Sequence, residues 1–247
     1  MSKAKSFSEE EIPYETLSDF GLTREMIEDL PMSVIDDITA GSVTPVLPIR
    51  VKADDDRSIN AKSRFSLSRL SNGVNVVFYP VLEHAPLEQF DDQQRNLLNE
   101  GKAILTEINK DGEKITAFVQ VDTATNQVMS VPSPVIGRNL QVIADEVSLS
   151  GPELNVIQNG DPLTIVVDDA EVTIGIDLLN SKTGIRIEDG DMQRWKSTAK
   201  REWDKYTFGV YGCWMTDENG DLSYVPEEQY TDELWNELKT RSNMQHR

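Results

Sequence analysis

The chain has 247 residues, and its 43 acidic against 24 basic side chains give a formal charge of −19. That charge repels phosphate backbones on average, which excludes indiscriminate nucleic-acid binding but leaves a local basic face or mimicry of nucleic acid open. The one cysteine excludes an internal disulfide framework and a cysteine-rich zinc site. The two histidines leave little for metal binding. No apolar run approaches the ~20 residues of a membrane span, and no signal peptide is evident, so we expect a soluble, cytoplasmic protein.

Three short helices are predicted, each ending at a glycine, and the glycines recur about every 60 residues, a period typical of repeated supersecondary units. Within each helix, apolar residues recur at helical spacing. Asp91 and Ser150 are placed to cap the second and third helices. Each glycine stands where a left-handed C-terminal residue is needed, a conformation that glycine adopts without a Cβ penalty. The three glycines are Gly41, Gly101 and Gly160.

Each glycine is followed by three predicted strands. The first strand is an apolar run (VTPVLPIRV, KAILTEI or PLTIVV), and a polar turn follows it. The second strand alternates apolar and polar residues, and a second turn leads to the third strand. A period of two indicates a strand with one buried face. Pro45, Pro48 and Pro162 indicate either edge positions or an irregular entry for the first strands. Each repeat is therefore predicted to be a helix and a three-stranded antiparallel meander, which buries its apolar face by packing with its copies.

A linker precedes the third repeat. Pro132 and Pro134 end the preceding strand, and a helix is predicted over 138–147. The predicted fold class is α+β, with tandem helix-plus-meander repeats and a C-terminal helix–hairpin–helix extension. The predicted division is a disordered N-terminus (1–11), a first repeat (12–82), a second repeat (83–134), the linker helix with the third repeat (135–190) and a C-terminal segment with a frayed tail (191–247).

The C-terminal segment follows a different pattern. Residues 191–206 are predicted to form one amphipathic helix, with Trp195 and Trp203 on its apolar face. An Asn-Gly pair at 219–220 predicts a hairpin. A last short helix is predicted to begin after Thr231, which is placed to cap it.

The segments YETLSDFGLTREMIEDLP, TPVLPIRV, RFSLSRLSNGVNVVFYP and LEQFDDQQRNLLNEGKAILTEINKDGEKITAFVQVDTATNQVM resemble two domain families of unknown function that occur side by side. Both families are found in proteins of conjugative transposons and related mobile elements of gut anaerobic bacteria. The resemblance covers about residues 12–230 and brings no catalytic residues with it. It implies a mobile-element setting and leaves the mechanism open.

Each candidate catalytic or metal-binding feature has a structural interpretation that we favour. Cys213 needs a base to act as a nucleophile, and its one plausible partner, His84, lies in a polar linker, so a buried strand cysteine is favoured. Residues 217–228 resemble a calcium loop without the glycine at its sixth position, so a hairpin turn is favoured. The acidic runs 54–56 and 168–169 fall where the repeat requires turns. No catalytic residue, cofactor or metal site is therefore predicted.

The candidate interaction surface is basic and aromatic. The predicted helix 191–206 carries five basic and three acidic residues, and two further basic residues lie on the polar face of a strand in the first repeat. Basic side chains beside tryptophans can bind single-stranded nucleic acid, whereas the interpretation that we favour places the tryptophans in the core and pairs the bases with acids. The surface consists of Arg194, Lys196, Lys200, Arg201, Lys205, Trp195, Trp203, Lys62 and Arg64.

These observations favour a non-enzymatic protein-interaction or adaptor module of a mobile genetic element. Its protein partners would bind exposed sheet faces or the tryptophan-rich C-terminal segment. The alternative is a nucleic-acid-linked factor, which either binds DNA through helix 191–206 or blocks a DNA-binding protein by charge mimicry. An enzyme of a type that the motifs do not reveal is the third hypothesis.

Overall fold

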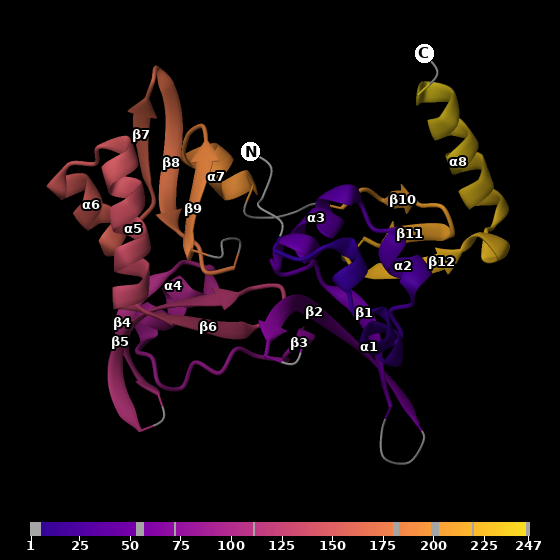
Figure 1. Ribbon diagram of the computed structural model, residues 1–247, viewed down its shortest axis with the longest axis horizontal. Helices are drawn as coiled ribbons and strands as arrows, with labels where there is room; N and C mark the ends of the chain where they lie inside the picture. The colour runs from indigo at the N-terminus through magenta and orange to yellow at the C-terminus, as the bar shows by residue number, and fades with distance from the viewer. Residues whose placement is uncertain are drawn as a thin grey trace. The chain divides into compact units, whose positions relative to one another are not determined.

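The computed structural model of the chain describes residues 6–52, 57–71, 73–110, 112–179, 183–198, 203–218 and 220–245 (Figure 1). Within these ranges the chain forms eight α-helices, two short 3-10 helices and four three-stranded antiparallel sheets. The predicted α+β class is confirmed, as is the succession of helix and antiparallel meander.

The chain folds as two compact units, which we describe separately. Unit 1 contains residues 1–80 and 202–247, and unit 2 contains residues 81–201. In sequence, unit 2 is therefore inserted between the two halves of unit 1. The C-terminal segment, predicted as an extension of the repeats, contributes a hairpin that shares a hydrophobic core with the first repeat.

Unit 1 contains two sheets, β1–β2–β3 and β10–β11–β12, each in chain order. One core joins Leu47, Phe65 and Val76 of the first sheet to Trp214 and Leu222 of the second. The helices of unit 1 are η1 (Glu9–Glu11), α1 (Tyr14–Asp19), α2 (Arg24–Glu28), α3 (Met32–Ala40), η2 (Glu227–Gln229) and α8 (Asp232–Gln245). Its strands are β1 (Leu47–Lys52), β2 (Ser58–Leu70), β3 (Gly73–Pro80), β10 (Tyr206–Phe208), β11 (Gly212–Thr216) and β12 (Leu222–Pro226).

Unit 2 contains the second and third repeats, with sheets β4–β5–β6 and β7–β8–β9. One face of sheet β7–β8–β9 packs against α5 and α6, where Ile157 and Ile174 are fully buried (Figure 1). The helices of unit 2 are α4 (Asp92–Asn99), α5 (Ser133–Val147), α6 (Gly151–Gln158) and α7 (Met192–Thr198). Its strands are β4 (Ile104–Lys110), β5 (Glu113–Asp122), β6 (Gln127–Pro132), β7 (Leu163–Val167), β8 (Ala170–Ile176) and β9 (Ile185–Asp189).

The glycine turn that defines the repeat is confirmed in all three copies. The φ angles of Gly41, Gly101 and Gly160 are +68°, +74° and +96°. Each glycine N–H donates a hydrogen bond of 2.9 Å to the carbonyl three residues earlier, and the next N–H donates to the carbonyl five residues before it. This is the Schellman pattern of a helix that ends in a left-handed residue. The residues three positions before the glycines, all fully buried, are Ile38, Leu98 and Ile157.

The glycine of the third repeat also approaches the backbone of the second. A Cβ at Gly160 would lie 2.6 Å from the carbonyl oxygen of Ala103. We expect Gly160→Ala to lower the free energy of unfolding of unit 2 by about 2–3 kcal/mol, because backbone strain and this contact add. Gly112→Ala is the matched control, since Gly112 also has a positive φ (+86°) but open space around it. Urea unfolding should show the smaller loss for the control, and equal losses would contradict the contact.

Most local signals for helix ends are confirmed. Asp91 and Ser150 form capping boxes at α4 and α6, and the hydroxyl of Thr231 accepts the N–H of the residue three positions later. The linker helix is the exception, since α5 begins at Ser133, earlier than predicted. The prediction that Pro134 ends the preceding strand is wrong, because proline also fits the first turn of a helix and Pro134 lies there in α5.

The predicted helix 191–206 is wrong in its extent. Among the described residues α7 ends at Thr198, and residues 203–205 lie outside any helix. A strand that was not predicted, β10, begins at Tyr206. Trp195 packs on sheet β7–β8–β9 of unit 2, whereas Trp203 packs against the core of unit 1. The helical spacing of the two tryptophans therefore reflects two separate cores and not one helix face.

Candidate functional site

A buried carboxylate, Asp29, joins the two halves of unit 1. Asp29 follows α2 and is 3% exposed. Its Oδ1 accepts the N–H of Val210 at 2.6 Å, and both of its oxygens accept the N–H of Tyr211, at 3.1 and 3.0 Å. Its Oδ2 also accepts the hydroxyl of Tyr224. Three donors of the C-terminal segment therefore share one acceptor from the N-terminal half, and hydrogen bonds to a charged acceptor are the stronger kind.

These contacts fix residues 209–211, the connection between β10 and β11, which we call the clasped turn. Glycine is required at its first position, because a Cβ on Gly209 would lie 2.1 Å from Oδ1 of Asp29. Beside it, the indole N–H of Trp214 donates to the carbonyl of Met26 at 3.0 Å. Burial, and then the hydrogen bond to Asp29, raise the pKa of Tyr224, so its hydroxyl stays protonated and keeps donating.

The side chains of the clasped turn reach into solvent although its backbone is fixed. Val210 is 79% exposed and Tyr211 is 46% exposed. The surrounding sequence is acidic, since residues 206–238 contain eight acidic and no basic side chains. Apolar side chains on a preorganised backbone lose little conformational entropy on association. The arrangement can therefore anchor another protein.

Cys213 is a fully buried strand residue, as the favoured interpretation predicts. It lies in β11, in a cluster with Tyr206 and Leu234. Burial raises the pKa of Cys213 to about 11, so the thiolate that a nucleophile needs is scarce at neutral pH. The side chain of His84 belongs to unit 2 and is exposed beside Glu83.

We expect Cys213 to resist alkylation at about pH 8 until unit 1 unfolds. Burial keeps the alkylating reagent from the sulfur, and the raised pKa keeps the thiol protonated. Since burial raises the pKa of Cys213 from 9.0 to about 11, its contribution to stability is complete below pH 9 and is lost as the pH rises through 11. Cys213→Ala should remove about 2 kcal/mol of the alkaline loss of stability. Urea titrations of both chains across this range measure the difference, and parallel alkaline losses would contradict the assignment.

Unit 2 contains a second buried polar network, centred on Arg186 of β9. Nε of Arg186 lies 2.9 Å from the carboxylate of Asp177, and Nη1 lies 3.8 Å from that of Glu188. The guanidinium carbon lies 3.5 Å from the ring centroid of Trp195, and Nη2 donates to the Trp195 carbonyl at 3.0 Å. Burial lowers the pKa of Arg186, while the two carboxylates act in the opposite direction. The network therefore fastens α7 to the sheet.

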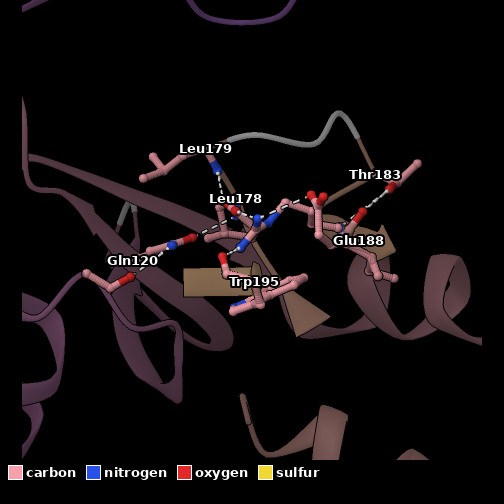
Figure 2. A network of polar contacts seen from close by, with 10 residues as sticks. Gln120, Leu178, Leu179, Thr183, Glu188 and Trp195 are labelled. Carbon is pink, nitrogen blue, oxygen red and sulfur yellow. Dashed lines mark hydrogen bonds and ion pairs between the residues drawn. The ribbon is translucent and has the colours of Figure 1, made fainter. Parts of the chain in front are cut away.

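Gln120 of β5 extends this network to the glycine turn of the second repeat. Its Nε2 donates to the carbonyl of Gly101 at 3.0 Å, and its Oε1 accepts the N–H of Leu178 at 2.7 Å. Figure 2 shows Gln120, Leu178 and Trp195 around the network. A buried amide that satisfies a donor and an acceptor fixes one sheet of unit 2 against the other. These groups are occupied by structural contacts.

The structure divides the predicted basic surface and does not bring its members onto one helix. Unit 2 contains Arg194, Trp195 and Lys196. Unit 1 contains Trp203, Lys205, Lys62 and Arg64. Lys200 and Arg201 lie outside the described residues.

The described members of this surface have different surroundings. Trp195 is buried, and Trp203 is half-buried against the unit 1 core. Arg194 pairs with Glu188 at 3.5 Å, and Lys62 pairs with Asp221. Arg64 is half-buried in β2, while Lys196 and Lys205 are exposed. Surface charges that already pair with carboxylates are less available to phosphate groups.

The acidic runs that the structure describes form turns. Asp168 and Asp169 have φ angles of +48° and +65° in the two-residue connection between β7 and β8, as a type I′ hairpin requires. The N–H of Asp221 donates to Oδ1 of Asp217 at 2.8 Å in the β11–β12 turn. Residues 54–56 lie outside the described residues. In the described ranges, no three His, Cys, Asp or Glu side chains gather where they could hold a metal ion.

The fold and these sites define an α+β protein with two buried polar networks, one centred on Asp29 and one on Arg186. The clasped turn is exposed. Residues 7–89 match a family model whose description is "Protein of unknown function (DUF4099)". Comparisons with curated proteins and with solved structures found no match. None of the helices in the described part of the chain combines the length and apolar character that a membrane crossing requires.

The residues at the centres of the two buried polar networks, Asp29, Asp177 and Arg186, were not predicted from the sequence. The position of Asp29 at the C-terminal end of α2 is one usable signal. A carboxylate there is unfavourable in the field of the helix dipole, which indicates that donors elsewhere in the chain stabilise it. Asp177 directly follows β8 and Arg186 lies inside β9, and nothing in their spacing indicates burial. The exposure of Val210 follows from the turn geometry, which depends on Asp29.

Proposed function

We propose that the protein is a non-enzymatic interaction module that recruits a protein partner through the clasped turn. The observation that carries this proposal is the combination of exposed apolar side chains, Val210 and Tyr211, with a backbone held by the buried Asp29. Tyrosine is enriched in the centres of protein interfaces, and a fixed backbone lowers the entropic cost of binding. The turn therefore has the properties of an anchor.

The partner has a basic surface around an apolar pocket. Residues 206–238 contain eight acidic and no basic side chains. Asp221 pairs with Lys62 and Glu237 pairs with Arg241, and the acidic excess gives the C-terminal part of unit 1 a negative charge. Complementary charge speeds association and disfavours wrong partners. The apolar side chains of the turn supply contact area, and the acidic residues select the partner.

The setting that we propose is a mobile genetic element. It rests on the resemblance of the sequence to domain families found in conjugative transposons. The match to the family model covers residues 7–89, and its description carries no activity. We expect the partner to be encoded by the same element, and a cell that carries the element is therefore the right source of lysate.

The test compares two variants of the full chain as bait. Val210→Ser with Tyr211→Ser should abolish capture of the partner, whereas Leu70→Ser, which changes another exposed apolar residue of unit 1, should not. Capture should persist at moderate salt because the anchor is apolar. Slow alkylation of Cys213 verifies that each bait is folded. Equal capture by both variants would contradict binding through the turn.

The nucleic-acid alternative is tested with the same preparations. Because Arg194 and Lys62 are paired with carboxylates, we expect no shift of double- or single-stranded DNA in a gel at low salt. A shift that Lys196→Glu and Lys205→Glu remove would replace the adaptor proposal. Capture of a DNA-binding protein that DNA displaces would favour charge mimicry.

A further inference from the structure

The edge of sheet β7–β8–β9 is open along β7. This strand pairs with β8 on one side, and the described residues provide no backbone partner on the other. In a hairpin with a two-residue turn, the pair beside the turn exchanges both hydrogen bonds, and the pairs then alternate. Val167 and Ala170 form that first pair, so the N–H and C=O groups of Thr164 and Val166 point outward. The side chain of Val166 is 70% exposed.

Within its five residues β7 lacks the features that protect sheet edges in proteins, and Pro162 lies just outside it, directly before Leu163. Charged residues, prolines and very short strands disfavour pairing with another chain. Every other edge strand of five or more residues in the described parts of the chain contains a charged residue or a proline, and β10 has three residues. The sequence of β7 is Leu-Thr-Ile-Val-Val, composed entirely of strand-forming and uncharged residues. An extended segment can therefore add to this edge.

The acidic residues at both ends of β7 indicate the charge of the segment that would add to it. Asp161 lies just before the strand, and Asp168 and Asp169 lie just after it. In an antiparallel pair of two copies, these acids would face one another across the strand ends, in chains of formal charge −19. Like charges placed opposite one another destabilise a strand pair. A second copy is therefore disfavoured, and a peptide with basic residues at both ends is favoured.

We propose that β7 binds an extended peptide of a partner protein by strand addition. The peptide has alternating strand-forming residues over about five positions, roughly 17 Å, flanked on both sides by lysine or arginine. Its backbone bonds the outward groups of Thr164 and Val166, and its flanks pair with Asp161 and the Asp168–Asp169 turn. This site belongs to unit 2 and does not depend on the clasped turn of unit 1.

The test uses labelled peptides and the full chain, with binding followed by fluorescence anisotropy. The probe set is KTVTVTK and RTVTVTR, with ETVTVTE and the proline-interrupted KTVPVTK as matched controls. We expect the basic-flanked peptides to bind at least about tenfold more tightly than either control and to weaken as salt rises. The affinity of KTVTVTK should fall about tenfold in Val166→Pro, which removes one outward N–H without breaking a β7–β8 bond.

A second variant separates backbone addition from charge. Asp168→Asn with Asp169→Asn keeps residues that tolerate the turn, and it should weaken KTVTVTK while leaving ETVTVTE unchanged or tighter. Unchanged circular dichroism verifies the fold of each variant. Equal binding by Val166→Pro, or no binding of basic-flanked peptides up to about millimolar concentration, would overturn the proposal. Self-association that Val166→Pro abolishes would assign the edge to a second copy and overturn it too.

Discussion

Replacing Asp29 with alanine is expected to lower the free energy of unfolding of unit 1 by about 3–5 kcal/mol. The substitution leaves the N–H groups of Val210 and Tyr211 and the hydroxyl of Tyr224 without their shared acceptor. These hydrogen bonds are part-buried, and each polar group that loses its partner away from water costs about 1–3 kcal/mol. A loss of this size is a large fraction of the stability of a typical domain.

The rate of alkylation of Cys213 measures this loss, because the chain has one cysteine and it is buried in unit 1. Asp19→Ala is the matched control, since it removes an exposed acid from the same unit, and it should change stability by no more than about 0.5 kcal/mol. Tyr224→Phe keeps the acceptor and removes one donor, so we expect a loss of about 1 kcal/mol. Similar alkylation rates for the Asp29 and Asp19 variants would contradict the role given to Asp29.

Replacing Asp177 with alanine should destabilise unit 2 by about 3 kcal/mol. The side chain of Arg186 is 10% exposed and that of Asp177 is 4% exposed, so the substitution removes the nearer of two carboxylates, Asp177 and Glu188, from a desolvated guanidinium. Removing one partner of a buried ion pair is costly, whereas replacing both with apolar residues of similar size is often neutral. Asp177→Leu with Arg186→Met should therefore be closer to the unaltered chain than Asp177→Ala.

Hydrogen exchange in peptides that cover β8 and β9 measures this effect within unit 2. Faster exchange is expected for Asp177→Ala, and partial recovery for the double variant. Asp189→Ala, which removes an exposed acid at the end of the same sheet, is the control and should leave exchange unchanged. A double variant that is less stable than Asp177→Ala would show that the ion pair itself stabilises the unit.

The features that the sequence predicts well are those set by local chemistry. The turns at Gly41, Gly101 and Gly160, and the caps at Asp91 and Ser150, depend on neighbours within a few residues. The strand alternation is also confirmed, because burial of one sheet face imposes a period of two. These signals were sufficient for the fold class and the repeat.

The features that the sequence does not predict depend on distant partners. Asp29 binds groups more than 180 residues further along the chain, and no local pattern records such a contact. Trp195 and Trp203 have the spacing of one helix face, but each packs in a different unit. Hydrophobic periodicity indicates that a side chain is buried and does not indicate which core receives it.

The insertion of unit 2 within the sequence of unit 1 sets an order of events during translation. The N-terminal half of unit 1 leaves the ribosome well before Trp214, which completes the core around Phe65. At roughly 5–20 residues per second, synthesis of the inserted unit takes on the order of ten seconds. Throughout that interval the nascent first half lacks its counterpart, and we therefore expect its apolar side chains to be accessible to chaperones and proteases.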